Sequence, residues 1–600
     1  MAEKESLDQH HVSLPSVKSE MSAESQEGRL DASNKTIDIL TRTCLAEAEC
    51  MNQKDQVLVS TPNMVASGFW TASTLVYRKM ASYDIYNWRE TKPGVWQREA
   101  DEIEAHHAAF VKAYEKSGGK ALDCLFHASL TLPVPEVGDL EATSTLFFEA
   151  LRIGWARLRH EMPTLASGVA YDMAEGKWMK TYRSIAGQDR RNIWLQQTVK
   201  TVSTGQTGTE WASTAPPTTE VATLFVIIPP QPSTSNINRD IVIRCGHDVI
   251  DGTGGLQVMD ALLHHAAQAF DEGPGHILPV FDDAEVVRLS PPLRVAVGAP
   301  QQLTPELMER LKYLGTCSMK DATSPIEKAT IPILRAGSFG EGKCRRIRHT
   351  FSVERTGKMI KALKSVGANP THAFHSAIAM ALRDFHGQVH PGTKDKQVQW
   401  YGHAIRSERS HCVPPYNTRA HSATVYYSGY GIGLPIVMPS LSPKDIKERN
   451  AEFSRILKEA GAFYRQCKED KYHPVLAPFL IGNFMMKLNV PSKDDPLEWR
   501  RLNPMPKPDL KAGSSVFFSS LGVLDKSVDG QVGQIWVDDV WCEADHVNPD
   551  VGVSMGTFKG ELFTLVGFNT AWHSEERAEE FLTRCEEIIF YWVDALEGIE

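Results

Sequence analysis

The chain has 600 residues, of which 42% are hydrophobic and 23% charged, which is enough for two large domains or one two-lobed unit with a substantial core. A formal net charge of -10 at pH 7 argues against a nucleic-acid partner, because such partners require a basic surface. The longest apolar runs, such as Leu224–Pro229, are far shorter than the roughly 20 residues that span a bilayer, so we expect a cytoplasmic protein without a membrane partner.

The first half of the chain mixes segments of strand and helix character. Residues 1–55 are polar and rich in Ser, Glu and Lys, which predicts a mobile tail without a secretory signal. Residues 56–325 are predicted to form an N-terminal lobe. Its expected strands are Leu125–Leu132, Val169–Tyr171, Lys177–Tyr182, Val221–Ile228 and Ile241–Cys245, and its expected helices are Leu140–His160 and Gly254–Phe270. The Ser/Thr/Pro-rich segment Ser203–Thr219 is predicted to be an exposed insertion.

The second half repeats this mixture after a connection that we place at Pro291–Gly342, which lacks strong periodicity. Residues 326–600 are predicted to form a C-terminal lobe. Its expected helices are Glu354–Val366, Pro370–Phe385 (capped near Thr371), Ser442–Gln466 and Ser574–Leu596. Its expected strands are Arg346–Val353, Val398–Ile405, Thr424–Tyr430, Ser515–Ser519, Gln534–Val540, Val551–Thr557 and Glu561–Phe568. The fold class is therefore α/β or α+β.

The segment Arg244–Gly252, with the sequence RCGHDVIDG, carries the clearest chemical signal. His247, Asp251 and Gly252 form an HxxxDG pattern that follows a hydrophobic strand and precedes a helix. A histidine at such a turn can present its ring to a cavity, and its ordinary pKa of about 6.5 suits proton removal near neutral pH. We expect Asp251 to brace the turn through an arginine and Gly252 to permit a close approach. Taken alone, the pattern also fits a solvated or core histidine.

HxxxDG in this setting resembles the coenzyme A-dependent acyltransferases: BAHD-type enzymes, fungal alcohol and trichothecene O-acetyltransferases, and condensation domains of peptide synthetases. The resemblance covers roughly residues 65–600, and further segments share it: Ala128–Leu132 with the helix that follows, Phe351–Arg355, Asn369–Leu382 and Phe517–Asp525. It implies an α/β fold of two similar chloramphenicol-acetyltransferase-like lobes, each a mixed sheet with flanking helices. The active-site channel, containing His247, would lie where the lobes meet.

The resemblance also implies direct acyl transfer, with acyl-coenzyme A as co-substrate and no bound cofactor or metal. His247 would remove a proton from an acceptor hydroxyl or amine while that atom attacks the thioester carbonyl. Hydrogen-bond donors would stabilise the oxyanion, and the candidates are Ser519, Ser520 and Gly522. For the partner of Asp251 the family pattern implies an arginine, with Arg406 as first candidate and Arg409 as second.

Departures from the individual branches narrow the resemblance. The DFGWG segment of BAHD enzymes is absent, with Asp550–Gly556 in a loosely similar place, and Gly246 stands where condensation domains carry a first histidine. The fungal O-acyltransferase branch fits best, which implies acetyl transfer to a terpenoid or polyketide-like alcohol of secondary metabolism by a monomer. Two alternatives stay open: amide or ester formation from a carrier-protein-bound donor, and a non-catalytic binding protein on the same fold.

Other patterns are interpreted as structural. Gly337–Lys343 fits GxxxxGK, but Cys344 follows where a phosphate-binding loop needs Ser or Thr, and the next segment has strand character. The adjacent pairs His106–His107 and His264–His265 lie on predicted helices, where neighbouring residues point in different directions. None of the ten cysteines forms a CxxC pair. We therefore predict no nucleotide or metal site from these motifs.

Overall fold

The computed structural model describes residues 83–598 except 116, 118, 135–138, 215, 231–234, 336, 393–394 and 485–509. The chain divides into two units, residues 1–62 and 63–600, and all described residues lie in the second. The predicted tail, residues 1–55, therefore lies outside the described residues.

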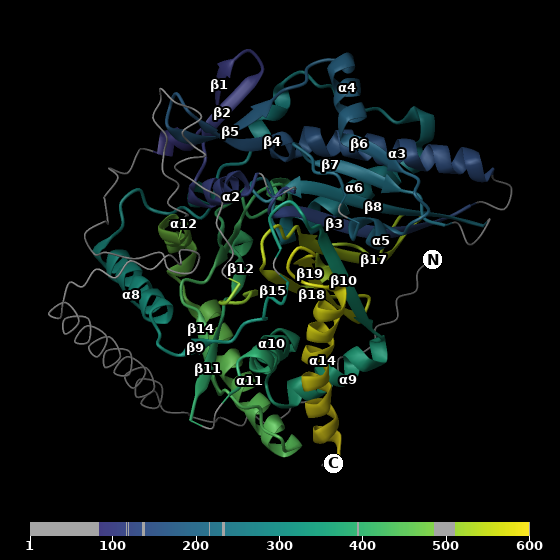
Figure 1. Cartoon of the computed structure of the whole chain (residues 1–600). Helices are drawn as coiled ribbons and strands as arrows, with labels where there is room; N and C mark the ends of the chain where they lie inside the picture. Colours follow the sequence, from purple (N-terminus) through teal and green to yellow (C-terminus); the bar gives the residue numbers. More distant parts are fainter. Residues whose placement is uncertain are drawn as a thin grey trace, which may run out of the picture. The chain divides into compact units, whose positions relative to one another are not determined.

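A six-stranded mixed sheet carries the HxxxDG segment (Figure 1). In sheet order its strands are β16 (Gln531–Val532), β17 (Ile535–Ala544), β3 (Asp123–Pro133), β8 (Asn236–Gly246), β7 (Thr223–Ile227) and β6 (Val199–Val202). Strands β3 and β8 pair antiparallel over their whole length, from Asp123 opposite Gly246 to Pro133 opposite Asn236. Both strands are almost entirely buried, as expected for a sheet that is covered on both faces.

Helices cover the two faces of this sheet. Helix α6 (Gly252–Glu272) approaches so closely that a Cβ on Gly255 would lie 2.0 Å from the ring of Phe126. On the other face, a Cβ on Gly208 in α5 (Gly208–Ala212) would lie 2.6 Å from the ring of the next residue, His127. Successive strand residues point to opposite faces, so α6 and α5 lie on opposite sides. Helix α3 (Leu140–Glu161) packs along α6.

A four-stranded sheet organises the second half of the chain. Its order is β10 (Cys344–Phe351), β19 (Glu561–Asn569), β18 (Val551–Phe558) and β15 (Val516–Val523), and the β15–β18 pair is parallel. Helices α9 (Val353–Ser365), α10 (Pro370–Val389) and α14 (Glu575–Glu597) pack against it. Their apolar side chains and those of the sheet form a second hydrophobic core, separate from the core of the six-stranded sheet.

One strand crosses between the two halves. Strand β17 belongs to the second half by sequence, yet it pairs with β3 of the six-stranded sheet (Figure 1, where its late-chain colour lies beside β3). After β17 the chain returns to the four-stranded sheet as β18. The two lobes therefore cannot be separated at one position in the sequence. The boundary between residues 325 and 326 stays a prediction.

The remaining elements complete the described chain. Smaller sheets have the orders β1-β2-β5-β4, β14-β11-β9 and β12-β13. Their strands are β1 (Arg89–Lys92), β2 (Val95–Glu99), β4 (Ser167–Asp172), β5 (Lys177–Arg183), β9 (Glu327–Lys328), β11 (Gln397–Gly402), β12 (Ile405–Ser407), β13 (Tyr427–Gly429) and β14 (Leu434–Pro439). The other α-helices are α2 (Glu102–Ala113), α4 (Gln188–Thr198), α7 (Leu293–Ala296), α8 (Pro305–Ala322), α11 (Ile446–Glu469) and α12 (His473–Phe484).

Three sequence interpretations need correction. The segment Ser203–Thr219 is not simply an exposed insertion, because it contains α5, whose Trp211 is 6% exposed and packs on Phe225 of the sheet. The connection Pro291–Gly342 contains the long helix α8, although the sequence lacked strong periodicity there. Helix α10 is capped by Asn369, two residues before the predicted cap at Thr371.

Candidate active site

His247 lies in the turn that joins the end of β8 to the start of α6. Its side chain is partly buried, and its Nδ1 atom is shielded from solvent. The turn between strand and helix thus carries a partly exposed imidazole. Its role in proton transfer stays a prediction.

Buried polar contacts anchor this turn to the neighbouring sheet. The carboxylate of Asp248 accepts a hydrogen bond from the backbone N–H of Val169 at 2.9 Å. The carbonyl of Asp248 accepts one from Nζ of the fully buried Lys180 at 2.9 Å, and the same Nζ atom binds Glu104 of α2 at 2.8 Å. The buried ion pair of Lys180 with Glu104 thereby holds the backbone next to His247 in place.

Gly246 leaves room for the carboxylate of Asp248. A Cβ at that position would lie 2.4 Å from Oδ1 of Asp248 and 3.1 Å from Nζ of Lys120. A histidine there, as in condensation domains, would displace the Asp248 carboxylate that anchors the turn.

Asp251 braces the turn, as predicted, and it does so across the two halves of the chain. Its carboxylate caps α6 through the N–H of Gly254 at 2.8 Å and accepts the N–H of Tyr426 at 2.7 Å. Nη1 of Arg409 donates to both carboxylate oxygens at 2.8 and 2.6 Å. These contacts fix the turn and the start of α6, and the orienting role of Asp251 in catalysis stays a prediction.

The first-choice partner of Asp251 was wrong. Arg406 lies on β12 and binds Glu408 instead, through Nε at 2.9 Å and Nη2 at 3.0 Å. The second candidate, Arg409, is the partner of Asp251, and its Nη2 also donates to the carbonyls of Ser422 and Thr424. The two arginines are three residues apart. The path of the chain after β12 determines which of them reaches Asp251.

The glycines of α6 differ in how strictly they are needed. A Cβ on Gly254 would lie 2.2 Å from the carbonyl of Ser422, whereas a Cβ on Gly252 would lie 3.4 Å from Leu521, an ordinary contact distance. Close approach therefore falls on Gly254 and Gly255 rather than on the predicted Gly252. The proximity of Leu521 nevertheless brings the segment of the predicted oxyanion donors beside the HxxxDG motif.

The predicted oxyanion residues lie on β15 at an irregularity of the sheet. The register with β18 shifts between Ser520 and Gly522, so Leu521 is an extra residue in the ladder, and Gly522 has a φ of +74°. Ser519 is partly buried, and Oγ of Ser520 lies 2.8 Å from Oγ1 of Thr371. The role of Ser519, Ser520 and Gly522 in binding an oxyanion stays a prediction.

Two residues that lie beside His247 were not predicted from the sequence. The ring of His107 in α2 stacks on the His247 ring, with centroids 4.3 Å apart and planes at 2°. Tyr427 of β13 lies 5.2 Å from the His247 ring, and its hydroxyl is 2.8 Å from Nε2 of His107. The pair His106–His107 was visible in the sequence, but no local spacing relates it to a histidine far along the chain.

Burial sets the charge state of this cluster. Desolvation lowers the pKa of His247 below 6.5, although the carboxylates of Asp251 and Asp248 oppose the shift. Burial and the charge of His247 hold the pKa of His107 well below its ordinary value and lower that of His106 to about 4. Burial also raises the pKa of Tyr427. At neutral pH the cluster therefore contains uncharged imidazoles and a protonated phenol.

The other sequence motifs lie elsewhere and are explained by packing. Cβ atoms on Gly337 and Gly342 would lie 1.9 and 2.0 Å from Ala571 and Asn569, so this glycine-rich loop is packed against the chain after β19.

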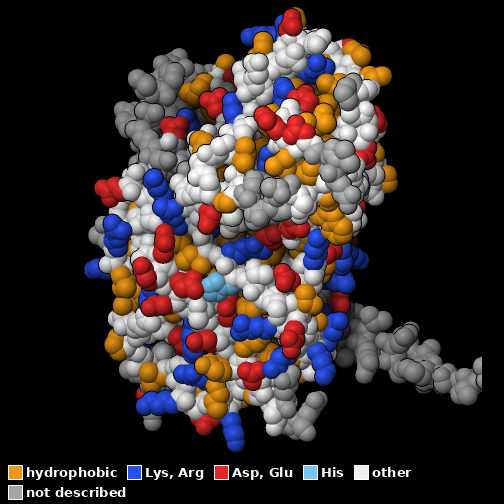
Figure 2. Space-filling model, turned by 90° about the vertical axis from the view of Figure 1, so that its right-hand side faces the viewer, with side chains coloured by type: hydrophobic (Ala, Val, Ile, Leu, Met, Phe, Trp, Pro, Cys, Tyr) orange, Lys and Arg blue, Asp and Glu red, His pale blue; other side chains and the backbone are white. Residues whose placement is uncertain are grey.

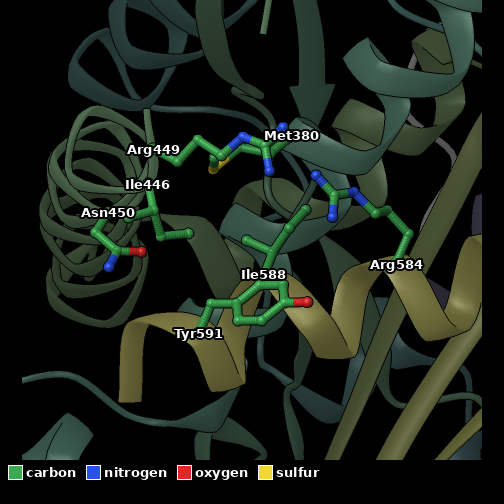
Figure 3. Close-up of a pocket in the computed structure, with 7 residues that line it drawn as sticks. All are labelled: Met380, Ile446, Arg449, Asn450, Arg584, Ile588 and Tyr591. Carbon is green, nitrogen blue, oxygen red and sulfur yellow. The ribbon is translucent and has the colours of Figure 1, made fainter. Parts of the chain in front are cut away.

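A shallow surface hollow between α10, α11 and α14 contains none of the predicted site residues; Figure 3 labels its lining as Met380, Ile446, Arg449, Asn450, Arg584, Ile588 and Tyr591. On the face drawn in Figure 2, basic and acidic side chains are interspersed rather than gathered by sign.

The chain is similar to several solved structures. The TRI3 trichothecene 15-O-acetyltransferase of Fusarium sporotrichioides superposes with a TM-score of 0.66 at 15% identity, over 85% of this chain and 99% of that chain. The epimerization domain from the third module of tyrocidine synthetase B has a TM-score of 0.49 at 12% identity, over 84% of this chain and 98% of that one. The condensation domain of the Monacolin K polyketide synthase MokA also has a TM-score of 0.49, at 11% identity, over 83% of this chain and 96% of that one.

The likeness to TRI3 establishes the fold. The chain has the α/β fold of the TRI3 acetyltransferase, and the predicted class of two chloramphenicol-acetyltransferase-like lobes with mixed sheets and flanking helices is confirmed. No protein-family model and no curated protein sequence matches the chain. Among the helices of the described residues, none combines the length and apolar character that crossing a membrane requires.

Proposed function

We propose that the protein is an acyltransferase that moves an acyl group, with acetyl as first candidate, from acyl-coenzyme A to a hydroxyl of a small molecule. The observation that carries this proposal is the partly exposed His247 imidazole, which lies in an anchored turn at the end of β8 and is uncharged at neutral pH because burial lowers its pKa below 6.5. A fixed neutral imidazole within hydrogen-bond reach of an acceptor is what general-base catalysis requires.

The reaction needs no covalent enzyme intermediate. Nε2 of His247 takes the proton of the acceptor hydroxyl while the oxygen attacks the thioester carbonyl, so that a C–O bond forms. The tetrahedral oxyanion then collapses with cleavage of the C–S bond, and the leaving thiolate takes the proton from the His247 imidazolium. Donors from the irregular Ser519–Gly522 segment are our candidates for the oxyanion, and one such donor contributes about 2.7–4 kcal/mol in other enzymes.

The acceptor class comes from the likeness to TRI3, which is described as a trichothecene 15-O-acetyltransferase. We propose a terpenoid or polyketide-like alcohol of secondary metabolism as acceptor, with the protein as a member of the fungal O-acyltransferase branch. The glycine at position 246, where condensation domains carry a first histidine, supports this branch over a condensation domain.

Donor and acceptor panels test the proposal. Acetyl- and longer acyl-coenzyme A, and the matching acyl-pantetheine as mimic of a carrier-bound donor, are incubated with terpenoid and polyketide alcohols and with amines. Ester products are identified by mass spectrometry. Ester from acyl-coenzyme A is the expected result. Product from acyl-pantetheine alone would favour the carrier-dependent alternative, and binding without product would favour a binding protein on the same fold.

A further inference from the structure

Two imidazoles from distant parts of the chain lie face to face in the candidate active site. The centroids of His107 and His247 are 4.3 Å apart with an interplanar angle of 2°, and His107 is only 3% exposed. Parallel rings at this distance restrict rotation of each other's side chain, because turning either ring out of plane would produce a clash. His107 therefore covers one face of the ring that is proposed to move the proton.

One buried network holds both rings in register. Glu104, one helical turn before His107 on α2, binds Nζ of Lys180 at 2.8 Å, and the same Nζ atom donates to the carbonyl of Asp248 at 2.9 Å. Asp248 follows His247 directly. Arg98 closes the network by donating to both oxygens of Glu104 at 2.7 Å. The separation of the two rings is thus set by buried charges rather than by a mobile loop.

Tyr427 fixes the outer ring from the second half of the chain. Its hydroxyl lies 2.8 Å from Nε2 of His107. The preceding residue, Tyr426, donates its backbone N–H to Asp251 at 2.7 Å, so the brace that holds the HxxxDG turn also positions Tyr427. The chain of contacts runs from Asp251 through Tyr427 and His107 to the face of His247.

We propose that His107 is a positioning residue for acyl transfer, whose stacked, Tyr427-bound imidazole fixes the plane of His247 and excludes water from one of its faces. This inference rests on the proposed function of His247. It assigns no proton transfer to His107 itself, since its Nε2 atom is already bound to Tyr427 and its Nδ1 atom is buried.

The titratable groups that surround His247 define what a pH measurement reports. They are His106 and His107 of α2, Asp248 and Asp251 of its own turn, Tyr427 of β13, and Lys180 of β5 behind the Asp248 carbonyl. Removing the His107 ring opens space for water at His247 and leaves the two carboxylates in place. The pKa of His247 should therefore rise toward 6.5 in His107→Ala and stay low in His107→Phe, which keeps the face covered.

The test combines a substrate-free and a catalytic measurement on the full chain. The pKa of His247 is followed by NMR with labelled histidine and assigned by the signal that His247→Gln removes. Acceptor-dependent thiol release is measured in parallel across pH. His127→Ala is the matched control, because His127 is equally buried, at 1% exposed, and stacks on Trp541 at 4.9 Å.

The expected result is a raised pKa of His247 and a loss of about 10- to 100-fold in kcat for His107→Ala, with KM nearly unchanged. His107→Phe should recover most of this loss, and His127→Ala should change neither quantity. An unchanged pKa and kcat in His107→Ala, or an equal defect in His107→Phe, would overturn the inference. If wild type showed no turnover, the proposed function would fail while the pKa comparison still decided whether His107 covers His247.

Discussion

His247 can accept a proton only in its uncharged form, and burial of the ring decides the pH at which that form is lost. Because burial lowers the pKa of His247 below 6.5, the neutral base is present above that pKa and disappears as the pH falls through it. We therefore predict an acid limb of kcat/KM with a midpoint below 6.5, measured by thiol release between pH 4.5 and 8. A midpoint at or above 6.5 would contradict the described environment of the ring.

The Asp251–Arg409 pair is the residue-scale contact with the largest predicted effect on folding. Removing the guanidinium in Arg409→Gln would leave the carboxylate of Asp251, 2% exposed, without its charged partner. We expect the free energy of unfolding to fall by about 3–5 kcal/mol in denaturant titrations. Arg455→Gln, which removes an exposed pair with Glu459, should cost about 1 kcal/mol or less. Equal losses in the two variants would disprove the assigned role of Arg409.

For individual residues, the sequence predicted which residue types act at the site but did not predict their partners from distant parts of the chain. The HxxxDG pattern predicted that Asp251 would brace its own turn through an arginine, but it did not identify which arginine. The choice of Arg409 over Arg406, and the stack of His107 on His247, depend on how α2 and the chain after β12 meet the turn. No periodicity or spacing encodes those contacts.

The glycines at the start of α6 show how tightly this helix is seated at the site. A Cβ on Gly255 would lie 2.0 Å from the Phe126 ring, and one on Gly254 would lie 2.2 Å from the Ser422 carbonyl. We expect Gly254→Ala and Gly255→Ala to destabilise the protein by about 1–3 kcal/mol through overpacking.

Two neighbouring substitutions serve as controls in the same thermal unfolding measurement. Gly252→Ala meets only Leu521 at 3.4 Å, so its effect should be small. Gly357→Ala in α9 meets nothing within 4 Å and should stabilise by about 0.5–1 kcal/mol through helix propensity. A larger loss for Gly252→Ala than for Gly255→Ala would contradict the seating of α6.

Elements with a strong apolar pattern were predicted within a few residues. Strands β3, β18 and β19 and helices α3, α6 and α14 are of this kind, whereas the strand predicted at Ile241–Cys245 covers only the second part of β8. Helices α4, α7, α8 and α12 were missed; α4, with the sequence QDRRNIWLQQT, buries little beyond Trp194 and Leu195. Helix α5 was hidden in a Ser/Thr/Pro-rich segment, because a single buried Trp211 outweighs its polar neighbours. Tertiary packing, which a composition pattern does not contain, stabilises such elements.

At the scale of the whole molecule, β17 joins the two halves of the chain, because it pairs with a strand of the first half. Asp545, just after β17, is paired with Arg244 of β8 and Arg346 of β10, and all three side chains are buried. Although burial raises the pKa of Asp545, the two arginines hold it below its usual value. The sheet that carries His247 is thereby joined to the second half of the chain near the candidate active site.

This junction makes a prediction for stability. Asp545→Ala would leave two buried guanidinium groups without their shared partner, and we expect the free energy of unfolding to fall by about 3–5 kcal/mol. Asp594→Ala, which removes an exposed pair with Lys358, is the control and should change it by about 1 kcal/mol or less. Urea titration followed by intrinsic tryptophan fluorescence measures both, and a loss confined to the control would refute the junction.

The two-lobed fold was predictable from the ordered set of family-like segments, but the strand exchange was not. Strand β17 was recognised as a strand, yet its neighbours depend on non-local pairing across the sheet. Prediction of a strand from its own pattern does not specify the sheet that it joins.

The measurement that bears most directly on the proposed function is acceptor-dependent thiol release from acyl-coenzyme A by wild type and His247→Ala. His264→Ala, which removes an imidazole with 51% of its side chain exposed on the outer surface of α6, is the matched control. If His247 is the general base, its loss should lower the rate by about 10²- to 10⁴-fold while the control stays near wild type. Equal rates in wild type and His247→Ala would show that His247 is not the general base and would contradict the proposed mechanism.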